Sequence, residues 1–245
     1  MNLTIDIGNT CTKLVAFDGL KQVEVVRMDR GEWGFLRDFC DKHNFDKGIC
    51  SSVVRLSNSE ETLLSELSFP VLMLESGVTP IPIINRYATP TTLGTDRLAA
   101  AVGAYSENKG HDVLVIDIGT CITYDFVTSS GEYLGGNISP GPSVRLKALN
   151  SFTGSLPLVD RHGDIPEIGD STETAIRCGV VRGVEYEIEG YIRDYLLKYP
   201  NLLVYLTGGV RLNLHITKKK CIFADDFIVS KGLNLILMYN EDLKK

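Results

Sequence analysis

The sequence lacks any long hydrophobic run. None of its 245 residues belongs to an uninterrupted apolar stretch of about 18 residues, so no membrane-spanning segment is expected. The pattern of a secretion signal is also missing, because Asp6 interrupts the first apolar residues and no basic segment precedes it. These absences predict a cytoplasmic protein that does not interact with a membrane.

Paired metal ligands are absent as well. The six cysteines are scattered without a Cys-x-x-Cys pair, and the four histidines are isolated from one another. A zinc site needs ligands in local pairs or in a convergent set, so none is predicted. In a chain of this length without a secretion signal, we expect the cysteines to be reduced thiols.

Positive charge is scarce. The chain has 25 basic and 31 acidic residues, which gives a formal net charge of −6. Its only basic run is Lys218-Lys219-Lys220, which we interpret as a solvated turn. Nucleic acid is therefore not an expected partner, because phosphate neutralisation needs clustered Lys and Arg.

Two common nucleotide-binding motifs are missing. The sequence contains no G-x-x-x-x-G-K-[ST], which excludes a P-loop enzyme. No G-x-G-x-x-G follows the first predicted strand, which removes the usual dinucleotide fingerprint.

What the chain does contain is an internal repeat. Residues 3–16 read LTIDIGNTCTKLVA and residues 114–127 read LVIDIGTCITYDFV. Each block predicts a β-hairpin, in which two strands are joined by a tight turn that contains glycine. The two blocks stand close to half the chain apart. We therefore expect two similar lobes, residues 1–110 and 111–245, that face each other across a cleft.

The rest of the chain alternates between strand and helix patterns, which indicates the α/β class. Short buried strands are predicted at 48–54, 71–75 and 202–206, and an ordered loop at 77–94. Helices are predicted at 32–43, 58–68, 95–106, 173–198 (with a break near Gly183 or Gly190) and 227–240.

A strand that ends in Asp-x-Gly-x-Thr is suited to phosphate binding. The glycine lets a phosphate approach the backbone amides, and the carboxylate can hold a hydrated Mg²⁺. One such hairpin is as well explained by an ordinary strand and turn. Two of them at half-chain spacing favour a site that holds a polyphosphate from both sides.

Glycines gather at two further places. Leu206-Thr207-Gly208-Gly209 ends a buried strand, which fits contact with an adenosine or a plain tight turn. The run from Gly135 to Gly141 reads GGNISPG, and by itself it fits a structured turn as well as a functional role.

Asp96 is the strongest candidate for a catalytic base. The run Thr91–Arg97 leads into a helix, and the helix macrodipole favours an ionised carboxylate in the first turn. Such a carboxylate can accept a proton from an attacking hydroxyl, while Arg97 suits a carboxylate or phosphate oxygen. The alternative is a helix-terminal Asp beside a surface Arg. Thr172 is likewise a candidate functional residue, and the alternative explanation for it is an ordinary helix cap.

With these motifs the chain resembles the type III pantothenate kinases, a branch of the acetate kinase/sugar kinase/heat-shock protein/actin superfamily. The matching motifs occur in order: DIGNT at 6–10 with Lys13, Tyr87, GTDR at 94–97, DIGT at 117–120, GGNISPG at 135–141, Thr172 and LTGG at 206–209. Two positions depart from the family's common pattern, Thr95 and Cys121, where Ala is usual.

The resemblance implies two actin-like (ribonuclease H-like) lobes with ATP in the cleft between them. It also implies phosphorylation of pantothenate to 4′-phosphopantothenate, the first step of coenzyme A biosynthesis. The residues it assigns to the ATP phosphates are Asp6, Ile7, Gly8, Asn9, Thr10, Cys11, Thr12 and Lys13, with Thr120 as a further ATP contact. Asp6 would hold Mg²⁺, directly or through water, and Asp117 a monovalent cation, K⁺ or NH₄⁺.

By the same resemblance Asp96 is the general base. The residues around pantothenate would be Tyr87, Gly94, Thr95, Asp96, Arg97 and Thr172. The family is typically a homodimer whose interface helps to close the pantothenate pocket.

Other functions remain open. A related small-molecule kinase would use the same fold on a different acceptor. A non-catalytic nucleotide-binding factor for transcription, or an actin-like filament protein, would belong to another class. The presence of Asp6, Asp96 and Asp117 together disfavours a protein that only binds nucleotide, which needs no base.

Overall fold

The computed structural model describes residues 1–215 and 221–245, so the lysine run at 218–220 lies outside the described residues. The first hairpin opens a five-stranded sheet because its apolar residues alternate along the strands: Leu3, Ile5 and Ile7 are fully buried on one face. The strands are β1 (Asn2–Ile7), β2 (Cys11–Asp18), β3 (Lys21–Asp29), β4 (Lys47–Ser52) and β5 (Val71–Met73), in the order β3-β2-β1-β4-β5.

The second hairpin opens a six-stranded sheet in the order β11-β10-β7-β8-β9-β6. Its strands are β6 (Ile84–Asn85), β7 (Val113–Ile118), β8 (Cys121–Val127), β9 (Glu132–Pro140), β10 (Leu203–Thr207) and β11 (Ile222–Ala224). Strands β7 to β11 repeat the order of β1 to β5, and β6 adds one strand at the edge. The two sheets therefore share one topology, and both predicted hairpins are confirmed.

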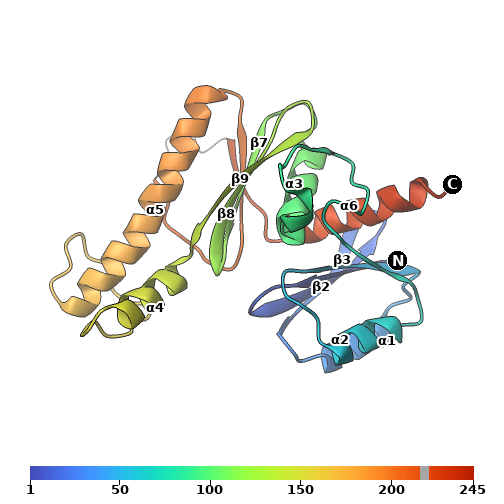
Figure 1. Ribbon diagram of the computed structural model, residues 1–245, viewed down its shortest axis with the longest axis horizontal. Helices are drawn as coiled ribbons and strands as arrows, with labels where there is room; N and C mark the ends of the chain where they lie inside the picture. The colour runs from blue at the N-terminus through green and yellow to red at the C-terminus, as the bar shows by residue number, and fades with distance from the viewer. Residues whose placement is uncertain (216–220) are drawn as a thin grey trace. The chain divides into compact units, whose positions relative to one another are not determined.

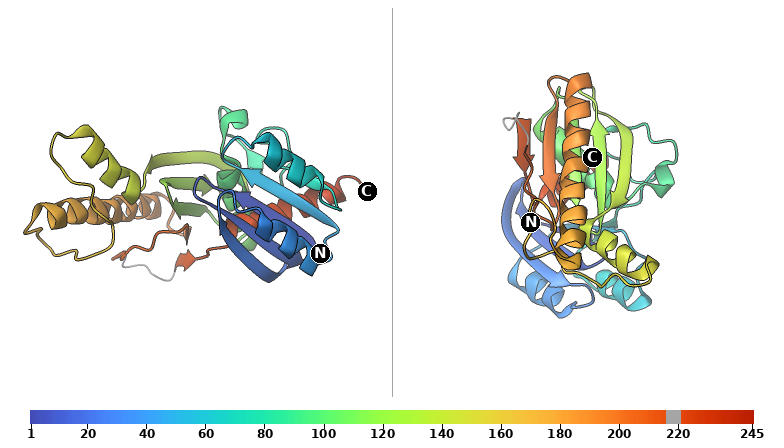
Figure 2. Two further views of the ribbon diagram at one scale, coloured as in Figure 1. Left: turned by 90° about the horizontal axis from the view of Figure 1, so that it is seen from below. Right: turned by 90° about the vertical axis from the view of Figure 1, so that its left-hand side faces the viewer.

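All the described helices except α4, which was not predicted, agree with the predicted ones within a few residues. They are α1 (Gly34–Lys42), α2 (Asn58–Ser65), α3 (Thr95–Glu107), α4 (Pro142–Phe152), α5 (Thr172–Lys198) and α6 (Ile228–Asp242). The long helix α5 runs unbroken through Gly183 and Gly190, so the break predicted there is wrong (Figure 2). The loop at 77–94 is ordered and contains β6 and a short 3₁₀ turn, Pro90–Thr92.

The structured turn, one of the two interpretations of 135–141, is also wrong. Residues 135–140 belong to β9, and Pro142 begins helix α4 directly after Gly141. The glycines serve close packing in a strand: a Cβ on Gly136 would overlap the backbone carbonyl of Tyr124 on β8.

The chain divides into two compact units. Unit 1 comprises residues 1–110, 126–135 and 227–245, and unit 2 comprises 111–125 and 136–226. In unit 1, α6 packs beside α3 (Figure 1), and their backbones touch at Gly103 and Gly232. No helix in the described ranges is long and apolar enough to cross a membrane.

Candidate active site

Asp6 stands near the end of β1 in a row of polar residues. Its register partners are Lys13 on β2 and Ser51 on β4. Residues directly opposite each other in a sheet share a face, so these three side chains lie on one face. Ile5 and Ile7 point to the other face, into the hydrophobic core.

The turn of this hairpin is shaped by Gly8. Its N–H donates to the carbonyl oxygen of Cys11 at 3.0 Å, and an added Cβ would lie 3.1 Å from that oxygen. Asn9, Thr10 and Cys11 are exposed, whereas Ile7 and Thr12 are fully buried. Within 6–13, the side chains of Ile7 and Thr12 are therefore structural, and these two residues can meet a ligand only through their backbone.

Two cations meet one aromatic ring beside this row. The Lys13 ammonium lies 5.6 Å from the ring centroid of Phe227, and the Arg27 guanidinium 6.0 Å from it. Arg27 is the register partner of Lys13 on β3. Both contacts lie within the range of a cation–π interaction. Sequence reasoning missed Phe227 because 214 residues separate it from Lys13.

Asp96 lies in the first turn of α3, as predicted. The backbone N–H of Arg97 donates to Asp96 Oδ1 at 2.8 Å. The hydroxyls of Thr95 and Ser51 are 2.8 Å apart, which links the start of α3 to β4 beside Asp6. Ser51 was not among the predicted site residues, since only the sheet register reveals it.

Arg97 is not a surface residue, which removes the alternative in which Asp96 and Arg97 form an ordinary exposed helix end. The side chain is 6% exposed, and its guanidinium lies 5.8 Å from the ring centroid of Tyr87. Tyr87 in turn packs over Gly135, where an added Cβ would lie 2.9 Å from the Tyr87 ring and where φ is +108°. The first glycine of the GGNISPG run thus makes room for Tyr87.

Three predicted motifs meet in unit 2. Thr207 is the register partner of Asp117, and an added Cβ on Gly208 would lie 2.6 Å from Asp117 Oδ1. The N–H of Gly141 donates to the carbonyl oxygen of Thr120 at 2.9 Å. The second Asp-Ile-Gly-Thr hairpin is therefore in contact with both the LTGG turn and the start of α4.

The carboxylate of Glu187, which sequence reasoning missed, connects several elements of this region by hydrogen bonds. Glu187 on α5 accepts hydrogen bonds from Tyr124 at 2.9 Å, Ser139 at 2.5 Å and Arg145 at 2.5 Å. Burial alone would raise the pKa of Glu187, but these three donors outweigh it and hold the pKa below its ordinary value. The donors come from β8, β9 and α4, so the network fixes α5 to all three.

Thr172 is the first residue of α5 and is exposed. The helix cap is Ser171, whose hydroxyl accepts the N–H of Thr174, so Thr172 is not the cap. Asp6, Tyr87, Gly94, Thr95, Asp96 and Arg97 belong to unit 1, whereas Asp117, Thr120 and Thr172 belong to unit 2.

Solved structures share this fold at low sequence identity. A Campylobacter jejuni protein described as a Baf family transcriptional activator has a TM-score of 0.56 at 19% identity, over 98% of this chain and 99% of that chain. The activator of 2-hydroxyisocaproyl-CoA dehydratase from Clostridium difficile, solved with bound ADPNP, has a TM-score of 0.54 at 15% identity, over 99% and 97% of the two chains. These similarities define the fold class alone, and the predicted actin-like class is confirmed.

Sequence relatives define the family. The profile of the type III pantothenate kinases matches residues 2–194. The type III pantothenate kinase of Bacteroides fragilis is 53% identical over 98% of both chains, and that of Phocaeicola vulgatus is 51% identical over 99% of this chain and 100% of its own. The chain belongs to the type III pantothenate kinase family.

Proposed function

We propose that this chain transfers the γ-phosphoryl group of ATP to the primary hydroxyl of pantothenate, with Asp96 as the general base. The hydroxyl oxygen forms a bond to the γ-phosphorus, the bond between that phosphorus and the β–γ bridging oxygen breaks, and ADP leaves. The hydroxyl proton passes to the Asp96 carboxylate. Phosphoryl transfer asks a protein mainly for positioning and charge stabilisation.

One observation carries the role of Asp96. Its carboxylate is held by the N–H of Arg97, and Thr95 beside it is hydrogen-bonded to Ser51, the sheet neighbour of Asp6. A base at a helix start that is tied to β4, the strand next to the phosphate hairpin, can keep one orientation through the reaction. Tyr87, Gly94, Thr95 and Arg97, all in unit 1, are proposed to bind pantothenate together with Thr172.

The residues at 6–13 are proposed to hold the ATP phosphates, together with Thr120. The tight turn at Gly8 supports backbone contact, and Lys13 supplies a positive charge close to Asp6 in the sheet. Asp117, beside Gly208 and Thr207, is proposed to bind K⁺ or NH₄⁺.

Asp6 is proposed to hold Mg²⁺, directly or through water. No group of three or more His, Cys, Asp or Glu side chains converges on a metal-sized site within the described residues. The single carboxylate of Asp6 fits Mg²⁺ that is also bound to substrate. This ion commonly takes one or two carboxylates and completes its shell with phosphates and water. It would neutralise charge on the transferring phosphoryl group.

We also propose a homodimer that acts in the cytoplasm. The exposed face of α5 carries Tyr186 at 64% exposure, and Gly179 and Gly183 where an added Cβ would meet nothing within 4 Å. Such a face allows a second helix to approach closely. The six cysteines, which all lie within the described residues, form no disulfide, which fits a reducing compartment.

The decisive experiment measures ADP release from MgATP with and without pantothenate, in K⁺ and in Na⁺. Wild type is expected to turn over only with pantothenate and faster in K⁺. Asp96→Asn is expected to lose about 10²–10⁴-fold in kcat, the usual contribution of a general base. Asp38→Asn, an exposed carboxylate on α1, is the matched control. Full activity of Asp96→Asn would refute its assignment, and ATP binding without turnover in wild type would favour a nucleotide-binding regulator.

A further inference from the structure

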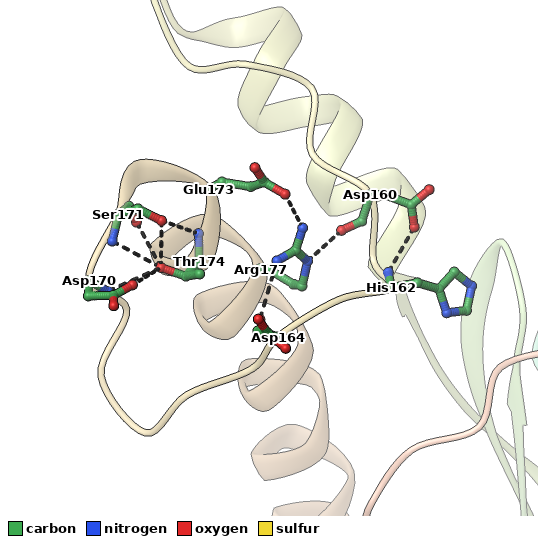
Figure 3. A network of polar contacts seen from close by, with 8 residues as sticks. All are labelled: Asp160, His162, Asp164, Asp170, Ser171, Glu173, Thr174 and Arg177. Atoms are coloured by element: carbon green, nitrogen blue, oxygen red, sulfur yellow. Dashed lines mark hydrogen bonds and ion pairs between the residues drawn. The ribbon is translucent and has the colours of Figure 1, made fainter.

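A buried arginine on α5 holds the loop that leads into this helix. Arg177 is 4% exposed, and it donates from Nε to the carbonyl oxygen of Asp160 at 2.9 Å and from Nη1 to that of Asp164 at 3.2 Å. Its third nitrogen, Nη2, pairs with the carboxylate of Glu173 (Figure 3). The guanidinium therefore binds two backbone carbonyls of the loop rather than its side chains.

The loop lies directly against the guanidinium. At Gly163 φ is +133°, and an added Cβ would lie 2.8 Å from Cζ of Arg177. Only glycine combines that backbone conformation with such a close approach.

Two further side chains of α5 bind the same stretch. Cys178 Sγ donates to the carbonyl oxygen of Pro166 at 3.1 Å, and Arg182 Nη2 donates to that of Ile165 at 3.1 Å. Four backbone carbonyls between 160 and 166 are thus bound by three residues of one helix.

The end of the loop is fixed just as closely. A Cβ on Gly169 would overlap the backbone of Ala175, and the Thr174 hydroxyl donates to Asp170 Oδ1 at 3.0 Å. The Ser171 cap follows (Figure 3), and Thr172 is the next residue in the chain. A chain held at 160–166 and again at 169–171 leaves Thr172 little freedom of position.

We propose that Arg177 is a positioning residue for pantothenate: it holds residues 160–166 against α5 and thereby fixes the exposed start of the helix at Thr172. The proposal rests on the proposed role of Thr172 in pantothenate binding. Loss of the guanidinium leaves the carbonyls of Asp160 and Asp164 without their buried donor, so the loop populates other paths. Affinity for pantothenate then falls in proportion to the fraction of molecules with the competent loop.

The test compares Arg177→Met and Arg177→Lys in the full-length enzyme. Arg177→Met is expected to raise KM for pantothenate about tenfold, as a competent-loop fraction near one in ten would. It leaves kcat and KM for ATP within about twofold. Arg177→Lys can still donate to one carbonyl, so its KM for pantothenate is expected to lie between those of wild type and Arg177→Met. Arg193→Met is the control, because that arginine is exposed on the same helix and its side chain is 73% accessible.

Hydrogen exchange across 160–168 provides a second readout. Faster exchange there in Arg177→Met, together with the selective rise in KM for pantothenate, would support the proposal. Faster exchange with an unchanged KM would overturn it. So would a parallel loss of kcat, ATP affinity and melting temperature, which would assign Arg177 to general stability. If Arg177→Met does not fold, Arg177→Lys decides between the same outcomes.

The double variant Thr172→Ala/Arg177→Met links the two residues. If Arg177 acts through Thr172, the two effects on KM for pantothenate are expected to be less than additive in free energy. Full additivity would overturn the link. Absence of pantothenate-dependent turnover in wild type would refute the proposed function itself, whereas wild-type turnover with an unchanged KM in Arg177→Met refutes this inference alone.

Discussion

Cysteines in this chain occupy two opposite environments. Cys11 and Cys121 are exposed at the start of the second strand of each hairpin, whereas Cys50 on β4 is fully buried. Burial raises the pKa of the Cys50 thiol to about 12, with smaller contributions from nearby carboxylates. Since the thiolate is the reactive form, Cys50 is expected to be inert near neutral pH.

This contrast gives a test of the proposed phosphate hairpin. Iodoacetamide at about pH 8 is expected to alkylate the exposed Cys11 at the start of β2, and MgATP is expected to slow that reaction at least about fivefold, because thiolate reactivity depends on access. Cys50 should stay unmodified in the folded protein and serve as the internal control. Mass spectrometry of the peptides measures both rates. An unchanged rate at Cys11 in saturating MgATP would contradict the assignment of residues 6–13.

Glu187 supplies a test of pH dependence. Because the folded-state pKa of Glu187 is lowered, the ionised group stabilises the fold above its unfolded pKa of about 4.3, and this contribution is lost as the pH falls through the folded value. Glu187→Gln is expected to cost about 1–2 kcal/mol at neutral pH, as for a hydrogen bond to a charged group. Urea unfolding should show this difference shrinking below about pH 4. A difference that stays constant with pH would mean that charge is not its source.

At the scale of elements, the pairing of α3 and α6 depends on two glycines. A Cβ on Gly103 would overlap the carbonyl oxygen of Ile228, and one on Gly232 would overlap that of Ala99. The two helices therefore touch backbone to backbone, with no room for a side chain at either crossing point. α3 carries Asp96, so this contact also steadies the proposed base.

Gly232→Ala is accordingly expected to destabilise the protein by about 1–3 kcal/mol, the usual cost of overpacking. Gly34→Ala, at the start of α1 where an added Cβ meets nothing within 4 Å, is the control and should have little effect. Thermal unfolding measures both. Equal melting temperatures for the two variants would show that the helices can move apart at no cost.

The elements that could be predicted are those whose pattern is local. The Asp-Ile-Gly hairpins are predicted by alternating apolar residues and turn glycines, and α3 is predicted by its alanine run. β9 and α4 could not be predicted, since three glycines and a proline in GGNISPG are typical of a turn. Here the glycines are needed because residues distant in the sequence pack against them: Tyr87 packs against Gly135, and the backbone of Tyr124 against Gly136. Ser51, Phe227 and Glu187 were missed for the same reason, because only the register and the packing bring them to the site.

At the scale of the whole molecule, one sheet topology occurs twice in the chain. Each copy places an aspartate near the end of its first strand beside a hydroxyl residue on the neighbouring parallel strand: Asp6 beside Ser51, and Asp117 beside Thr207. The copies differ two residues after the start of the second strand, where Lys13 stands in β2 and Thr123 in β8. Thr123 carries no charge, so the first copy alone offers a cation at this position.

The proposed homodimer is tested at this scale. Wild type is expected to sediment as a dimer, and Tyr186→Glu on the exposed face of α5 should raise the dissociation constant about tenfold or more, because a buried unpaired charge is costly at an interface. Phe35→Glu, which changes a residue 51% exposed on α1, is the control and should leave the dimer intact. A monomeric wild type at micromolar concentration would contradict the proposal.

The division of unit 1 among three segments has a consequence for how the protein is made. Helix α6, which packs on α3 and β1, follows all of unit 2 in the chain. During synthesis, all of unit 2 leaves the ribosome before α6 does. Until then, the surfaces of α3 and β1 that α6 covers stay exposed. The domain that starts first is thus completed last, and its folding rate is governed by long-range contacts. A chain truncated after residue 226 should accordingly contain a protease-resistant unit 2 together with an accessible α3.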